Sequence, residues 1–227
     1  RILGKPWVLI SDAELIQKIL VSDREHFPKK GDAVDEMKVL FGDQGILVTE
    51  GEQWLRQRKM CMPAFRHEQL LAMTDGMNSV ALQTIKHQKG KNEIESLSFM
   101  NRVAFSSICI SAFDHNINAL ESNSHDPILV AQELATKELI KRIQRTKYWK
   151  SLPIPSNFHL ANALKEQETA LKQIINEKSE GAGEAKILLN EFLRARDDNG
   201  NPMSETELFH MCMQFMAAGH ETTGAAL

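Results

Sequence analysis

The chain has 227 residues, 42% of them hydrophobic and 25% charged, which is ordinary for a soluble globular protein and enough for one large domain with a substantial core. Its net charge of -3 comes from Lys and Arg scattered among Asp and Glu, which excludes an extended basic surface for nucleic acid. Three cysteines without paired spacing argue against a disulfide framework, and no apolar run reaches the roughly 18 residues of a membrane span.

Strand-forming residues are confined to the start of the chain, where residues 7–10 are Trp, Val, Leu and Ile. Beyond them the hydrophobic pattern is helical. Capping-box patterns at Ser11, Thr49 and Ser204, each with Glu three residues later, predict three helix starts, and the first helix should reach about residue 22. The sequence therefore predicts a mainly α fold with a small β region at the N-terminus.

Further helices are expected between these starts, because apolar residues recur at helical spacing and Pro and Gly separate the segments. Pro127 lies where a first helical turn would begin, which is a favourable position for proline. We expect these helices over residues 68–88, 95–113, 126–149, 157–179 and 184–196.

The last helix contains residues that are poor helix formers. Gly219 costs roughly 1 kcal/mol relative to Ala, and Thr222 and Thr223 lose side-chain freedom against the preceding turn. One explanation is a helix crossing, where small residues let another backbone approach. The other is a ligand beside Gly219, with a Thr hydroxyl bonded back to a carbonyl and Glu221 next to it, a pair suited to general acid catalysis.

A second pair of polar residues lies in the helix that follows Thr49. Trp54 and Arg58 are four residues apart and therefore share one face of that helix. An indole N–H and a guanidinium group are two donors suited to binding a carboxylate. The simpler alternative is a half-buried Trp with the stem of the Arg lying over its ring.

Both patterns resemble the cytochrome P450 family. Residues 218–223, Ala-Gly-His-Glu-Thr-Thr, match the A-G-x-[DE]-T-[TS] pattern of that family's long central helix. Residues 51–65 match its G-x-x-W-x-x-x-R…P-A-F segment. The resemblance covers essentially the whole chain, as about the first half of a family member. It implies a cytochrome P450-like fold, present here as a single incomplete domain over residues 1–227.

The resemblance also implies roles for individual residues. One pair would hold a propionate of haem b, a second group would leave space for haem and dioxygen, and an acid with its neighbouring hydroxyl would deliver protons. The implied cofactor-binding residues are Trp54, Arg58, Ala218, Gly219 and Thr223, and the implied catalytic residues are Glu221 and Thr222.

The iron-ligating cysteine of the family lies in an F-x-x-G-x-x-x-C-x-G loop, which none of the three cysteines here matches. Cys61, Cys109 and Cys212 are instead expected to be small buried hydrophobic residues. Glu191 and Arg194 precede the central helix and are expected to form an exposed ion pair, not the family's E-x-x-R pair. Both chain ends look like truncations, so the fragment alone should fold poorly, bind haem weakly and be inactive.

For the parent protein, the resemblance implies a haem-dependent monooxygenase that inserts one oxygen atom from dioxygen into a lipophilic substrate, with fatty-acid-like molecules nearest. Residues 29–45, 126–149 and 157–179 would shape the substrate pocket. Electrons from NAD(P)H would arrive through a reductase or ferredoxin. The protein would be cytoplasmic, or held on the cytoplasmic face of a membrane by an anchor upstream of this chain. Two alternatives stay open: a non-catalytic helical protein that binds haem or another ligand, and a helical scaffold unrelated to haem.

Overall fold

The structure is a computed structural model that describes residues 8–90, 93, 95–120, 126–144, 152, 154–180 and 187–227. Within these residues the chain is mainly helical, as predicted, and contains no strand. Val8 and Leu9 are exposed and lie outside any helix or strand. Trp7, at the start of the predicted strand, falls outside the described residues with the six residues before it. The mainly α class is therefore confirmed, and the small β region is not seen.

The described helices lie between residue 13 and residue 226. Three of them are not α-helices: η1 is a π-helix, and η2 and η3 are 3₁₀-helices. In chain order they are α1 (Ala13–Gln17), η1 (Lys18–Ser22), η2 (Arg24–His26), α2 (Asp32–Phe41), α3 (Gly51–Cys61), η3 (Met62–Phe65), α4 (His67–Ala72), α5 (Thr74–Gln88), α6 (Ser96–Phe113), α7 (Pro127–Gln144), α9 (Pro155–Glu180), α10 (Leu188–Arg194) and α11 (Glu205–Ala226).

One of the three predicted capping boxes forms. At the start of α11, Ser204 and the Glu three residues later exchange both reciprocal hydrogen bonds. The other two predictions were wrong in detail. Asp12, not Ser11, caps α1. The hydroxyl of Thr49 donates to the side-chain oxygen of Gln57 at 2.7 Å, and it accepts no capping hydrogen bond from the backbone of α3.

Helix boundaries differ from the prediction in two places. The segment expected to be one helix over residues 68–88 is divided at Met73, whose carbonyl accepts a hydrogen bond from Ser111 of α6. Helix α2 was not predicted. Its buried positions include Glu36, which forms a 2.5 Å ion pair with Arg142 of α7, so the apolar pattern of a helix is interrupted. The ends of the helices predicted near residues 145–149 and 184–186 fall outside the described residues.

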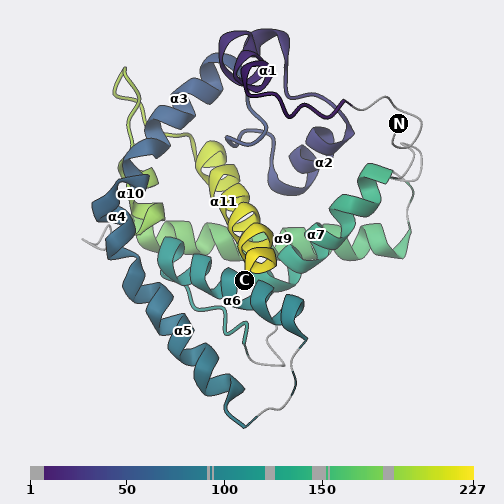
Figure 1. Ribbon diagram of the computed structural model, residues 1–227. Coiled ribbons are helices and arrows are strands. Elements are labelled where there is room, and N and C mark those ends of the chain that lie inside the picture. The colour runs from purple at the N-terminus through teal and green to yellow at the C-terminus, as the bar shows by residue number, and fades with distance from the viewer. Residues whose placement is uncertain are drawn as a thin grey trace.

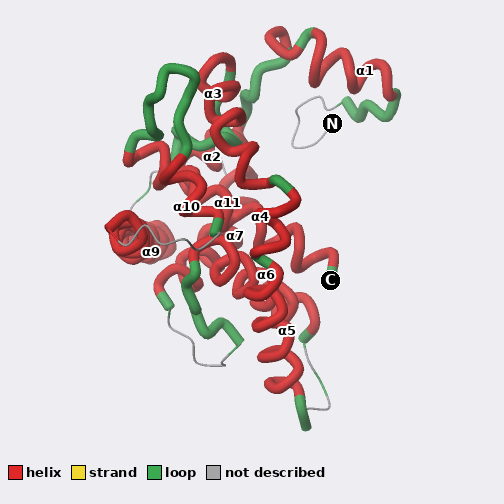
Figure 2. Tube along the Cα trace, turned by 90° about the vertical axis from the view of Figure 1, so that its left-hand side faces the viewer, coloured by secondary structure: helices red, strands yellow, loops and turns green. Residues whose placement is uncertain are grey.

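Helices α6 and α11 pack against each other at the centre of the molecule, where they cross (Figure 1). Helix α9 runs behind α11 in that view, with α7 packed against it, and is seen end-on in Figure 2. The main hydrophobic core lies among α6, α9, α10 and α11. Its fully buried members include Phe105, Leu171, Phe192, Met211 and Met216. This core holds α11, which carries one of the two sequence motifs, in the middle of the fold.

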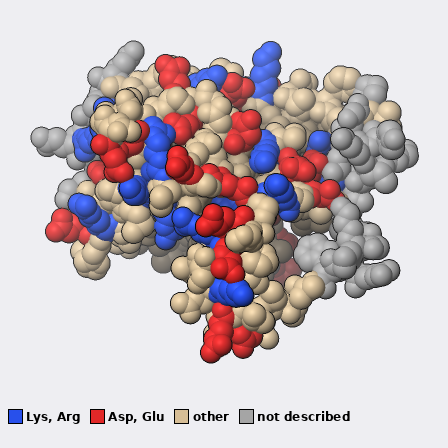
Figure 3. All heavy atoms as spheres, turned by 90° about the horizontal axis from the view of Figure 1, so that it is seen from above, with Lys and Arg blue, Asp and Glu red and all other residues tan. Residues whose placement is uncertain are grey.

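The surface carries both signs of charge. Figure 3 shows Lys and Arg interspersed with Asp and Glu over the face that it presents. In the part of the chain that the structure describes, no helix combines the length and the apolar character needed to cross a bilayer.

Candidate functional site

The ring of Trp54 on α3 is surrounded by basic side chains. The guanidinium carbons of Arg24 and Arg58 lie 5.3 and 5.4 Å from the ring centroid, and the Lys29 ammonium lies 5.6 Å from it. These distances are within the range of cation–π attraction. The three cations come from η2, from the loop before α2 and from α3. The carboxylates of Glu25, Glu50 and Glu52 line the cavity beside the same half-buried indole, so both signs of charge meet there.

The donors of the predicted pair are available for a ligand. The Trp54 indole N–H and the Arg58 guanidinium form no hydrogen bond with any described residue, whereas the Lys29 ammonium donates to the carbonyls of Ile46 and Thr49, both at 3.1 Å. A cavity of about 630 Å³ lies beside Trp54. Arg58 also lies over the indole, as the simpler sequence interpretation expected, and this packing leaves its N–H groups accessible to a carboxylate.

The glycines of α11 lie where this helix crosses α6. A Cβ on Gly219 would meet the Ile108 side chain at 3.1 Å, and one on Gly224 would lie 2.7 Å from the Asn101 Cα. Both contacts are with α6, so the helix-crossing explanation accounts for the small residues. Gly219 faces a side chain that can shift, whereas Gly224 faces backbone. A role of Gly219 in making space for a ligand stays a prediction.

The hydroxyl of Thr222 donates to the carbonyl of Ala218 at 2.7 Å, which is the back-bond expected from the sequence. Helix α11 nevertheless remains continuous to Ala226. Burial raises the pKa of the neighbouring Glu221 carboxyl above its ordinary value. Together with Thr223, these residues form an exposed polar face at the C-terminal end of α11.

His220 has no role predicted from the sequence, but it has a distinct place in the structure. It lies inside the motif but points away from the exposed face, with 3% of its surface accessible. Its ring packs against Phe105 of α6 at 5.0 Å between centroids. Burial lowers its pKa, which keeps the imidazole neutral. Its buried Nδ1 has no hydrogen-bond partner among the described residues.

The structure does not bring the two motifs into direct contact. Within the described residues, no hydrogen bond, ion pair or ring contact joins Trp54 or Arg58 to residues 218–223. The cations around Trp54 come from η2, the loop before α2 and the last turn of α3, whereas the acid–hydroxyl pair lies near the end of α11. The structure thus shows cations around Trp54 and, separately, a polar helix face that carries a carboxyl with a raised pKa.

Comparison with known proteins identifies the chain. The family model described as cytochrome P450 matches residues 1–227. The chain belongs to the cytochrome P450 family. This membership removes the alternative of a scaffold on which both motifs are coincidental.

The cytochrome P450 relatives are distant and longer. The chain is 29% identical to cytochrome P450 72A397 of Kalopanax septemlobus and 28% identical to cytochrome P450 709B1 of Arabidopsis thaliana, in each case over 98% of this chain and 45% of that protein. It is 22% identical to the bifunctional cytochrome P450/NADPH–P450 reductase 2 of Bacillus subtilis (strain 168), over 99% of this chain and 22% of that protein. The chain thus spans about half the length of the first two.

The cysteines of this cytochrome P450 chain are buried thiols, as expected. Cys61 is 4% exposed, and Cys109 and Cys212 are fully buried. Burial raises the pKa of Cys61 to about 12 and raises the pKa values of the other two as well. The ion pair predicted between Glu191 and Arg194 is present at 3.7 Å, with half of the Arg side chain exposed.

Proposed function

We propose that the chain is the N-terminal part of a haem-dependent monooxygenase that inserts one oxygen atom from dioxygen into a lipophilic substrate. The observation that carries the proposal is the family match over all 227 residues, which includes both motifs. Electrons would come from NAD(P)H through a reductase or ferredoxin. A relative whose name joins a cytochrome P450 to an NADPH–P450 reductase supports that source.

A haem propionate would suit the basic residues around Trp54. Haem carries two propionate carboxylates, and Trp54 and Arg58 present an indole N–H and a guanidinium group to one of them. Arg24 and Lys29 add positive charge within 5.6 Å of the same ring and would partly offset the carboxylates of Glu25, Glu50 and Glu52, which line the same cavity. On α11, Gly219 with Ala218 and Thr223 would lie against the haem and leave room for dioxygen. Haem bound through a cysteine thiolate supplies the activation of dioxygen.

Glu221 and Thr222 would handle protons in this reaction. The raised pKa of Glu221 brings its carboxyl nearer to neutral pH, where a group can both hold and release a proton. The Thr222 hydroxyl is held in one orientation by its bond to the carbonyl of Ala218, and its lone pairs remain available to accept a proton. The pair could pass a proton from solvent along the exposed face of α11.

The helices around a second, smaller hydrophobic cluster would determine which substrate binds. Helices α2, α7 and α9 meet there through Leu40, Phe41, Ala135 and Leu160. The buried ion pair between α2 and α7 holds the same elements together. The apolar side chains of these helices would suit a lipophilic molecule, and fatty-acid-like substrates are the first class to screen. Such substrates also suit a protein associated with a membrane surface.

Replacement of Thr222 tests this proposal in the full-length protein. Thr222→Ala should lower the amount of product formed per NAD(P)H consumed by about tenfold or more, because positioned acids and their relays contribute on the order of 10²–10⁴-fold. Haem content should stay unchanged. Thr206→Ala, at an exposed Thr in the first turn of the same helix, is the matched control.

The outcomes separate the competing functions. Unchanged coupling in Thr222→Ala would show that the relay assignment is wrong. A wild-type protein that binds haem but forms no product with any lipophilic substrate would favour the non-catalytic binding protein.

A further inference from the structure

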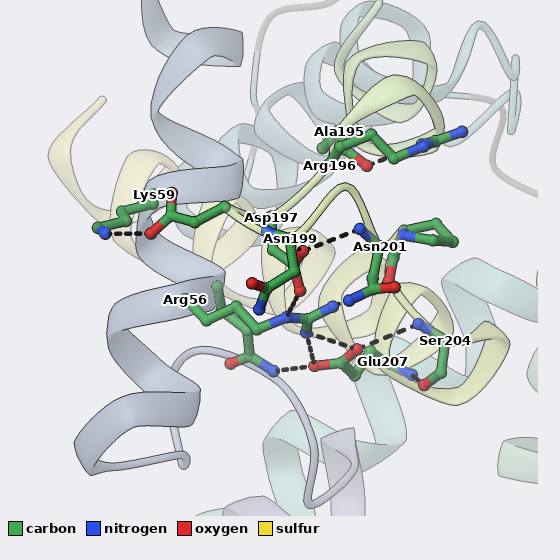
Figure 4. Close-up of polar contacts among 12 residues, drawn as sticks. Arg56, Lys59, Ala195, Arg196, Asp197, Asn199, Asn201, Ser204 and Glu207 are labelled. Atoms are coloured by element: carbon green, nitrogen blue, oxygen red, sulfur yellow. Dashed lines mark hydrogen bonds and ion pairs between the residues drawn. The ribbon is translucent and has the colours of Figure 1, made fainter.

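Helix α3 has two differently used polar faces. Residues of an α-helix are about 100° apart around its axis, so Arg56 lies roughly 200° from Trp54 and from Arg58. The side chain of Arg56 therefore points away from the face proposed to bind haem. It points to the loop that precedes α11 and to the first turn of α11 (Figure 4).

Arg56 uses every edge of its guanidinium group there. Its Nε donates to Asp197 at 2.7 Å, and Nη1 donates to both carboxylate oxygens of Glu207, at 2.8 and 3.0 Å. Its Nη2 donates to the carbonyl of Pro202 at 2.8 Å. The planar fork of Arg matches this set of acceptors, and a Lys ammonium would not reach all of them.

Glu207 joins α3 to the start of α11. The same carboxylate accepts from the Gln57 amide at 3.1 Å and from the Ser204 backbone N–H at 3.1 Å, the second bond being half of the α11 capping box. Gln57 is fully buried and also binds the carbonyl of Gln44 at 2.7 Å. One carboxylate thus caps α11 and receives two side chains of α3.

The charges in this group support one another. The hydrogen bond from Arg56, followed by the one from the backbone N–H of Asn201, holds the pKa of Asp197 at about 2. Burial alone would raise the pKa of Glu207, but bonds from Ser204, Arg56 and Gln57 outweigh it, so that pKa is lowered. Both carboxylates therefore stay ionised opposite Arg56 at neutral pH.

We propose that Arg56 is a positioning residue, which sets the orientation of α3 against α11 and thereby holds Trp54 and Arg58 in place for the haem propionate. This inference rests on the proposed function. A group of polar residues, here called the Arg56 cluster, connects α3 to the start of α11 by hydrogen bonds. Its members are Arg56, Gln57, Asp197, Ser204 and Glu207.

Two measurements on the full-length protein test this role. The first is the rate at which haem is lost to an excess of apomyoglobin. The second is backbone hydrogen exchange, measured with and without haem. Arg56→Gln should speed haem loss by roughly tenfold, the lower end of what removing a group that orients a cofactor ligand causes. Exchange should rise in residues 51–61 and 195–207 while α9 keeps its protection. Arg56→Lys should give a smaller effect in the same segments, and it carries the test if Arg56→Gln does not fold.

Two control variants separate positioning from general stability. Leu171→Ala removes a fully buried side chain of α9 and should destabilise the protein through a core cavity, so that hydrogen exchange rises across the helices packed on that core and not in residues 51–61 and 195–207 alone. Lys59→Gln removes the exposed pair with Asp198 on the same helix and should change neither measurement.

The role is overturned if Arg56→Gln loses haem at the wild-type rate, or if its exchange increases evenly across the helices as in Leu171→Ala. A wild-type protein that retains no haem would reject the proposed function instead. In that case the exchange pattern alone decides whether Arg56 orients α3.

Discussion

His210 and Gln214 lie one turn apart on α11 and bind the backbone that leads into α3. The N–H of Gln44 donates to His210 Nδ1 at 3.2 Å, and the Gln214 amide donates to the carbonyl of Gly42 at 3.0 Å. Gly42 has a φ of 89°, and a Cβ there would lie 2.0 Å from the His210 ring. Single side chains of α11 therefore decide the path of the loop before the proposed haem-binding helix.

Protonation of His210 should weaken this arrangement. Burial lowers its pKa, more than Asp43 and Glu168 raise it, and Lys172 lowers it further. Because the folded pKa lies below the ordinary value of about 6.5, the unfolded chain takes up the proton first as pH falls. Stability contributed by neutral His210 is complete above that value and is lost as pH falls below it.

We expect the urea concentration at which half of the full-length protein is unfolded to decrease as the pH is lowered from about 7.5 to about 5.5. The decrease should be smaller in His210→Asn, whose side-chain oxygen can still accept a hydrogen bond from the Gln44 N–H. His220 is also buried and neutral, so part of the pH dependence should remain in the variant. An identical pH profile in wild type and variant would contradict this assignment.

At the scale of whole elements, the crossing of α6 and α11 determines which residues of the motif are exposed. The glycines of α11 let α6 approach, His220 fills the space beside Phe105, and the polar residues remain on the other face. The same crossing therefore explains both the unfavourable helix formers and the exposure of the proposed proton relay.

Alanine substitutions at the two glycines should have different effects on stability, because Gly224 faces backbone and Gly219 faces a side chain. Gly224→Ala should destabilise the protein by about 1–3 kcal/mol, because its Cβ would lie 2.7 Å from the Cα and 2.9 Å from the backbone N of Asn101. Gly219→Ala should change stability little, since the Ile108 side chain at 3.1 Å can shift and Ala favours helix by roughly 1 kcal/mol.

Urea or thermal unfolding of the two glycine variants provides the comparison. A loss of haem binding in Gly219→Ala without loss of stability would support its ligand-space role. Equal destabilisation by both substitutions would contradict the distinction between side-chain and backbone contacts.

At the scale of the whole molecule, the chain contains the residues proposed for propionate binding and proton transfer, but its cysteines are all protonated thiols in the core. A thiolate is the form of cysteine that ligates a metal. The 227 residues alone should therefore bind haem weakly and show no thiolate-type absorption spectrum when reduced and exposed to CO.

The same absorption measurement on the full-length protein is the control, and it should show the thiolate-type spectrum. Such a spectrum from the 227-residue chain would mean that one of the three buried cysteines becomes a ligand, and it would contradict the assignment of all three to the core.

The sequence by itself determined the mainly α class, the central helix with its Ser204 cap, the back-bond of Thr222 and the family of the chain. These features depend on neighbours within about one helical turn or on short motifs, so local spacing is enough to predict them. The helix over residues 95–113 was predicted for the same reason, because apolar residues occur at every turn of α6.

Only the tertiary structure decided which charges are structural. Glu36 pairs with Arg142, and Arg56 with Asp197 and Glu207, across separations of 106, 141 and 151 residues. Nothing in the local pattern distinguishes such residues from solvated surface charges. These charged residues come close to their partners only when the core packs α2 against α7 and α3 near α11. Burial then removes water from the charged groups, so each of them needs its partner.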